Sequence, residues 1–159
     1  MPATDSLGGL SWVISVLFGW GGDHLHVFRI GERSYSDSYV QLEGTGDEGE
    51  ARLARLFCTG VTKIEYTYDL GACWRHEIVL EKLLPRTPAQ ATLQCREFAG
   101  DSPVEYPEED LDEDPDGRRP VAQTRPFRLD RVNATFTSRH YVVDEEFDEE
   151  FDRRTGGGR

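Results

Sequence analysis

The sequence is short of cysteine, of N-terminal positive charge and of long apolar runs, and each shortage excludes a class of protein. No Lys or Arg precedes Arg29, so the start of the chain lacks the basic region of a secretory signal peptide. The longest apolar stretch, residues 7–20, contains glycine and serine and is too short to cross a bilayer. Three irregularly spaced cysteines favour free thiols in a reducing compartment over a disulfide framework. We therefore expect a cytoplasmic protein with no membrane-spanning segment.

The net charge of −12 comes from a small part of the chain. Half of the 30 acidic residues lie in two runs, 105–116 and 144–152, and neither run contains Lys or Arg. An acidic protein lacks the basic surface that nucleic acids and anionic membranes attract, which argues against direct nucleic-acid binding. The two runs predict either solvated, flexible segments or a surface that captures a basic partner.

Apolar periodicity predicts the secondary structure. Residues 7–18 repeat apolar side chains at helical spacing, Thr4, Asp5 or Ser6 can cap this helix, and Gly19 can end it. From His24 the period changes to two, which is typical of strands. The expected elements are a helix over 7–18, strands near 24–30, 63–69, 73–83 and 92–98, and short helices over 50–57 and 126–136. This pattern predicts the α+β class, with a largely antiparallel sheet and the N-terminal helix packed on one face.

The same pattern predicts a single domain with an acidic, flexible C-terminal part. We expect residues 1–104 to form the α+β domain and residues 105–120 to form an acidic linker. Residues 121–140 would add a short element to that domain, and residues 141–159 would form an acidic, glycine-rich tail.

Several sequence blocks carry a family resemblance. They are residues 18–20 with 24–30, residues 66–71 with 74–77, residues 80–82, Cys95 and, more weakly, residues 127–133. Together they resemble proteins like the third open reading frame of the Ri plasmid, also described as transposon passenger proteins of the TnpR type. The resemblance implies a soluble α+β fold, often encoded beside mobile elements, and it implies no particular reaction.

The sequence departs from that family in ways that bear on the sheet. Family members have a strand pair before the first helix, whereas this chain starts just ahead of the helix and lacks a segment near residue 115. Leu70 and Ala72 flank the turn glycine where the family has Phe and Asp, and Tyr106 replaces a cysteine. Either the start codon lies upstream, or the sheet has an open edge that can pair with a second copy in a homodimer.

Histidine and aromatic side chains recur on the apolar faces of the expected strands, where they would converge on one cleft. The residues predicted to line it are Trp20, His24, His26, Tyr68, Asp69, Trp74 and His76. Such a cleft would bind a protein partner or a small ligand, with no cofactor.

The same residues also allow catalytic interpretations. His24, His26 and His76 together with Cys95 would suit a tetrahedral zinc site, or else the histidines are hydrogen-bonded core residues. Asp69 would orient His24 or His76 as a general base, or else it starts the turn at Gly71 through an Asx-type hydrogen bond.

A glycine pattern at residues 44–49 matches the dinucleotide-binding motif but lacks its context. Asp47 and Glu48 would repel a pyrophosphate, and no parallel βαβ unit surrounds them. We expect these two acids to complement the N-terminal dipole of the 50–57 helix instead. The sequence as a whole favours a non-enzymatic interaction module. The alternatives are a zinc-dependent enzyme that uses the same residues and an acidic decoy for a basic partner.

Overall fold

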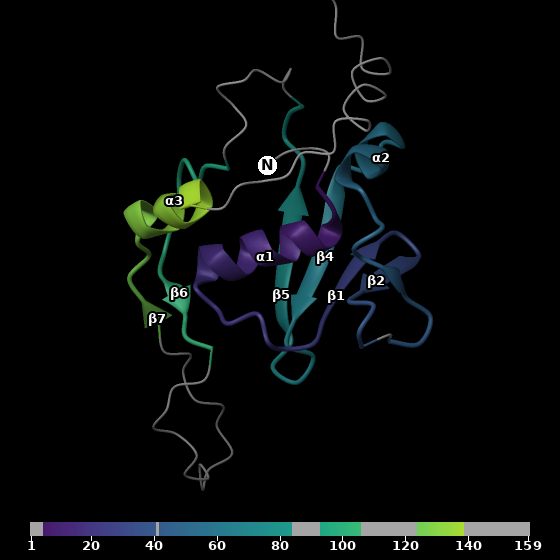
Figure 1. Cartoon of the computed structure of the whole chain (residues 1–159), viewed down its shortest axis with the longest axis horizontal. Helices are drawn as coiled ribbons and strands as arrows, with labels where there is room; N and C mark the ends of the chain where they lie inside the picture. The colour runs from purple at the N-terminus through teal and green to yellow at the C-terminus, as the bar shows by residue number, and fades with distance from the viewer. Residues whose placement is uncertain (1–4, 41, 84–92, 106–123, 139–159) are drawn as a thin grey trace, which may run out of the picture.

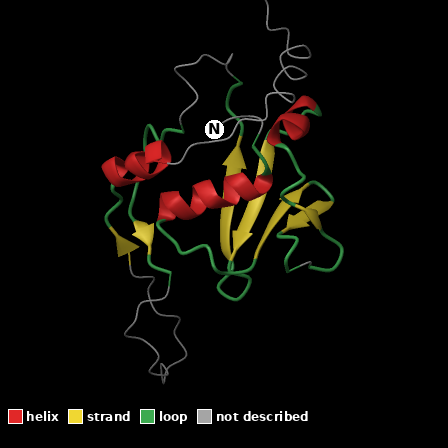
Figure 2. Ribbon diagram, in the orientation of Figure 1, coloured by secondary structure: helices red, strands yellow, loops and turns green. Residues whose placement is uncertain are grey.

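The computed structural model describes residues 5–40, 42–83, 93–105 and 124–138. In chain order the elements are α1 (Leu7–Phe18), β1 (His26–Ile30), β2 (Arg33–Ser36), β3 (Gly46–Asp47), α2 (Leu53–Cys58), β4 (Lys63–Tyr68), β5 (Trp74–Val79), β6 (Ser102–Pro103), β7 (Thr124–Arg125) and α3 (Leu129–Ser138). A five-stranded sheet has the order β3-β2-β1-β4-β5, and β6 pairs with β7 separately. Figure 1 and Figure 2 show α1 lying across one face of the larger sheet. The predicted α+β class is confirmed.

Helix α1 forms where the apolar period predicted it. Of the three candidate caps, Ser6 is the one used, and its side chain accepts a hydrogen bond from the Gly9 N–H. The helix ends at Gly19, whose φ of 65° is a left-handed conformation that glycine adopts without a steric penalty. Leu7 and Ile14 are buried beneath the helix, so its apolar stripe forms the core with the sheet.

The larger sheet is mostly antiparallel, and its strands β4 and β5 show the expected alternation of side chains between the two faces. Strand β1 pairs antiparallel with both β2 and β4, and β4 pairs antiparallel with β5. Among the strands that the structure describes, only the short β2–β3 pair is parallel. Every second residue of β4 is buried, and Tyr66 and Tyr68 are almost completely inaccessible. Residues 75, 77 and 79 of β5 are exposed on the opposite face. One face of this sheet therefore supports the core and the other faces solvent.

A second apolar cluster joins α1 to α3. It contains Val13, Leu93, Val132 and Phe136, and the Trp12 ring packs edge-on against Phe136 at 5.8 Å. Figure 1 shows α3, β6 and β7 together on one side of the sheet. The short helix expected over 126–136 is present, although it begins at Leu129.

Two local predictions were wrong. A strand was expected over 92–98, but residues 93–98 form none. The Asn133 side chain takes the place of a ladder partner at Cys95. Its Oδ1 accepts from the Cys95 N–H at 2.8 Å, and its Nδ2 donates to the Cys95 carbonyl at 3.0 Å. Helix α2 begins at Leu53 without an acidic residue in its first turn, so Asp47 and Glu48 do not complement its dipole. The Glu48 carbonyl instead accepts from the Gly8 N–H in the first turn of α1, at 3.3 Å.

No described helix is long and apolar enough to span a membrane. The expected acidic linker, apart from Glu105, and the expected tail lie outside the described residues.

Candidate functional site

Trp20 is the centre of an aromatic cluster at one end of the sheet. Its ring stacks on Tyr68 with centroids 4.8 Å apart and planes 8° apart, and on Phe18 at 4.6 Å and 17°. Trp74 is tilted against it at 5.7 Å, and His76 meets it edge-on at 5.4 Å. The Trp20 Nε1–H donates to the Pro103 carbonyl at 3.0 Å. Residues from α1, β4, β5 and β6 thus fix the orientation of this indole.

Glu105 fastens the loop after α1 to this cluster. One oxygen of its carboxylate accepts from the Tyr68 hydroxyl, and the other accepts from the Gly21 N–H at 2.7 Å. The Tyr68 hydroxyl also accepts from the Gly22 N–H at 3.1 Å. His24 Nε2 lies 3.6 Å from the Glu105 carboxylate. Burial and the hydrogen bond to Glu105 raise the pKa of Tyr68, so the phenol remains a neutral donor.

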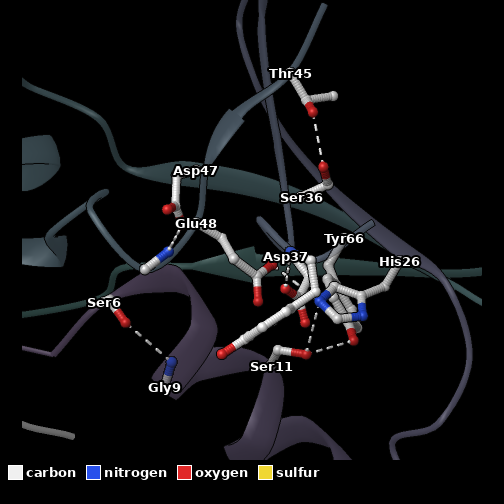
Figure 3. A network of polar contacts seen from close by, with 12 residues as sticks. Ser6, Gly9, Ser11, His26, Ser36, Asp37, Thr45, Asp47, Glu48 and Tyr66 are labelled. Atoms are coloured by element: carbon white, nitrogen blue, oxygen red, sulfur yellow. Dashed lines mark hydrogen bonds and ion pairs between the residues drawn. The ribbon is translucent and has the colours of Figure 1, made fainter. Parts of the chain in front are cut away.

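A polar network adjoins this cluster between α1 and the middle of the sheet, and its member Tyr66 packs against His76 at 5.6 Å (Figure 3). His26 Nε2 is 2.9 Å from Glu48 Oε2 and 3.3 Å from Ser11 Oγ. The Ser11 hydroxyl is also 2.9 Å from the Tyr66 hydroxyl. Burial by itself lowers the pKa of His26, but the hydrogen bond and charge of Glu48 outweigh it, and the pKa is raised. Burial raises the pKa of Tyr66, which stays protonated.

The geometry of this network differs from that of a catalytic triad. In a triad the carboxylate binds one imidazole nitrogen and the serine hydroxyl binds the other. Here Ser11 and Glu48 both contact Nε2 of His26, while Nδ1 faces the His24 carbonyl at 3.3 Å. Glu48 therefore cannot orient the ring through one nitrogen while Ser11 gives its proton to the other. The network joins α1 to β1, β4 and the loop after β3.

The structure brings together five of the seven residues predicted to line a cleft. These are Trp20, His24, Tyr68, Trp74 and His76. His26, the first residue of β1, lies instead in the network with Ser11 and Glu48. Asp69 forms the turn after β4, and its Oδ1 accepts from the Gly71 N–H at 2.9 Å and from the Ala72 N–H at 3.2 Å. This Asx-type turn is the structural alternative that the sequence allowed.

The four predicted zinc ligands do not assemble. Cys95 belongs to the cluster around α3, whereas His76 packs against Phe18 and Trp20, and His26 pairs with Glu48. Among the residues that the structure describes, no group of three or more His, Cys, Asp or Glu side chains could hold a metal ion. Burial raises the pKa of the Cys95 thiol, which disfavours the thiolate that zinc requires.

Sequence reasoning missed the three polar residues that organise these clusters. Ser11 interrupts the apolar stripe of α1, and such an interruption is a signal for a buried polar contact. The sequence favours a role for Glu48 at the N-terminus of the 50–57 helix, whereas its carboxylate pairs with His26. Glu105 is the first residue of an acidic run, and nothing in that run distinguishes it from its neighbours.

Fold and site together define a small α+β domain with a buried aromatic cluster and an adjoining Ser–His–Glu network. The chain belongs to the plasmid pRiA4b ORF-3-like family, whose sequence profile matches residues 1–152. This confirms the resemblance seen in the sequence blocks.

Two relatives extend the comparison. The chain is 28% identical over 108 residues to the uncharacterized protein y4hQ of Sinorhizobium fredii (strain NBRC 101917 / NGR234), which covers 66% of this chain and 55% of the relative. It is also similar to the crystal structure of a protein of unknown function, MM3350 from Methanosarcina mazei Go1. That match has a TM-score of 0.50 and 26% identity, and it covers 55% of this chain and 52% of the other. The chain therefore spans about half the length of these relatives.

Proposed function

We propose that this chain is a non-enzymatic binding module, and that its ligand surface is the rim formed by His24, Trp74 and Glu105. The rim lies beside the Trp20–Tyr68 stack, and that stack is the observation that carries the proposal. The His24 and Glu105 side chains are 37% and 21% exposed, and Trp74 is half-buried. An imidazole, an indole and a carboxylate thus reach the surface around a fixed aromatic floor.

The floor supports binding because it is already ordered. The polar ends of Trp20 and Tyr68 are hydrogen-bonded to Pro103 and Glu105, and the rings hold each other in place. A ligand that meets a preorganised surface loses less free energy to side-chain ordering. The neighbouring network does not have the geometry of a catalytic triad, because His26 contacts its acid and its serine through the same nitrogen. This favours a binding function over proton transfer.

The chemistry of the rim favours a basic side chain of a protein partner. An indole face attracts a cation, and a carboxylate forms charge-assisted hydrogen bonds with a guanidinium or ammonium group. The acidic-decoy alternative shares this preference for a basic partner, but it depends on a tail that lies outside the described residues.

A titration with short peptides tests this proposal. Acetyl-Gly-Arg-Gly-amide would be added to the nitrogen-15-labelled protein, with the glutamate-containing peptide as the matched probe. We expect the indole N–H signal of Trp74 to shift saturably with the arginine peptide only, while Trp12, which packs on α3, stays unchanged.

Substitutions localise the effect. Trp74→Ala is expected to weaken arginine-peptide binding by at least about tenfold, the size of effect typical of a central aromatic contact. Tyr39→Ala removes an aromatic ring that is 96% exposed elsewhere on the protein, and it should leave binding unchanged. Equal shifts with both peptides, or undiminished binding by the folded Trp74→Ala variant, would contradict the proposed surface.

A further inference from the structure

Strand β5 forms one edge of the larger sheet. In the order β3-β2-β1-β4-β5 it pairs with β4 on one side, and no other described strand pairs with it. Figure 1 shows β5 at the outside of this sheet. The side chains of Arg75, Glu77 and Val79 on its outer face are exposed. An edge strand of this kind offers its main-chain groups to another strand.

The register with β4 shows which main-chain groups point outward. The Leu80 N–H donates to the Thr62 carbonyl at 2.8 Å, so these two directly opposed residues form a hydrogen-bonded pair. Bonded and non-bonded pairs alternate along an antiparallel ladder. The residues of β5 that bond to β4 are therefore Trp74, His76 and Ile78, which lie opposite Tyr68, Tyr66 and Ile64. The N–H and C=O groups of residues 75, 77 and 79 point toward the free edge.

The exposed face of the sheet ends at this edge with an unbalanced row of charges. Arg29 lies opposite Glu65, and Glu65 lies opposite Glu77. Two carboxylates directly opposite each other repel, and Lys63, with Nζ 2.6 Å from a Glu77 oxygen, offsets part of that repulsion. A cation beyond Glu77 would complete the row. Arg75 is exposed two residues away on the same strand, and no described strand lies beyond it at this edge.

We propose that β5 pairs antiparallel with β5 of a second copy about a two-fold axis at His76. Arg75 then lies opposite the partner's Glu77, and Glu77 lies opposite the partner's Arg75. Both residues have outward main-chain groups, so the charged pairs are also hydrogen-bonded pairs of the new ladder. This inference does not rest on the proposed function, although Trp74 belongs both to the ligand rim and to this strand.

Competing registers fit less well. An axis at Glu77 also matches outward groups with outward groups, but it sets the Glu77 carboxylates of both copies against each other. A shift by one residue sets main-chain groups that point to the free edge opposite groups that already bond to β4. It also turns the apolar face of one strand to solvent. In the register about His76, the half-buried Trp74 and Ile78 side chains lie opposite each other across the interface. Apolar contact on one face and charge pairing on the other both favour this register.

Charge reversal tests the pairing. The Arg75→Glu variant has carboxylates at positions 75 and 77, and the Glu77→Arg variant has guanidinium groups at these two positions. Sedimentation equilibrium should show a concentration-dependent dimer for the unmodified protein. Each variant alone should associate at least about tenfold more weakly, whereas an equimolar mixture should form a one-to-one dimer because every pair is again opposite in charge. Arg33→Glu makes the same change at an exposed position of β2 and should leave the dimer intact.

In the charge-reversal experiment, the proposal is overturned by an unmodified protein that remains monomeric at all concentrations, by single variants that dimerise as the unmodified protein does, or by a mixture that fails to associate. Circular dichroism would establish that each variant is folded. If a reversed variant does not fold, Arg75→Gln and Glu77→Gln replace the pair. Both should then weaken the dimer, alone and mixed, and unchanged association would overturn the register. Amide exchange should slow at Arg75 and Glu77 as the protein concentration rises, and concentration-independent exchange there would also overturn it.

Discussion

The imidazole Nε2 of His26 lies 2.9 Å from Oε2 of Glu48, and both side chains are largely buried. His26 begins β1, and Glu48 directly follows β3. The pair joins the middle of the sheet to a loop that also contacts the first turn of α1, through the hydrogen bond between Gly8 and Glu48. Because Ser11 of α1 completes the network, this contact couples helix, sheet and loop.

The His26–Glu48 pair should make stability depend on pH. The pKa of His26 in the folded protein is raised above 6.5, so the folded state binds its proton more tightly than the unfolded state. The contribution is fully present below the unfolded value and is lost as pH rises through the folded-state pKa. We expect Glu48→Gln to lower the free energy of unfolding by about 1–3 kcal/mol at acidic pH, with a smaller loss at alkaline pH. Urea unfolding across this range measures the difference.

Glu50→Gln provides the control for that experiment. Glu50 is an exposed acid two residues from Glu48, and its replacement should change stability little at any pH. A Glu48→Gln loss that is the same at every pH would contradict the assigned linkage.

The Trp20 ring should be a major source of stability. It is buried and contacts rings from α1, β4 and β5. Trp20→Ala leaves a cavity at this junction and is expected to cost about 3–5 kcal/mol in the free energy of unfolding. Trp20→Phe keeps a ring but loses the donor to the Pro103 carbonyl, so its loss should be smaller. Equal losses for the two variants in denaturant titrations would show that ring packing is not the main contribution.

The Asn133 side chain should hold the 93–98 segment in place. Its amide makes two hydrogen bonds with the backbone of Cys95. Asn133→Ala is expected to destabilise the protein by about 1–3 kcal/mol, because the Cys95 groups lose their partner. Amide hydrogen exchange at Cys95 should accelerate.

Asn133→Asp and Thr135→Ala sharpen this test. The aspartate keeps an acceptor for the Cys95 N–H and should retain more of its protection from exchange. Thr135→Ala changes an exposed residue of α3, whose hydroxyl bonds only within the helix, and should leave Cys95 unaffected. Unchanged Cys95 exchange in Asn133→Ala would mean that another contact positions the segment.

Local sequence accounts for the elements that formed as predicted. The spacing of apolar residues over 7–18, with Ser6 before it and Gly19 after it, contains the information for α1. The alternation of apolar and polar residues in β4 and β5 likewise predicts which side chains face the core. The turn at Asp69 follows from its short side chain, which bonds N–H groups two and three residues ahead. These features depend on neighbours along the chain.

Contacts between distant residues could not be derived in that way. The segment 93–98 has strand-like composition, but Asn133, 38 residues away, satisfies its backbone instead. The tertiary structure alone decided that Glu48 binds His26 and that Glu105 binds Tyr68. It also separated Cys95 from the histidines. The sequence by itself determined helix α1, strands β4 and β5 and the turn at Asp69, because their periods and caps are local. The partners of buried polar groups were decided only by packing, since a carboxylate can bond whichever donor the fold brings within reach.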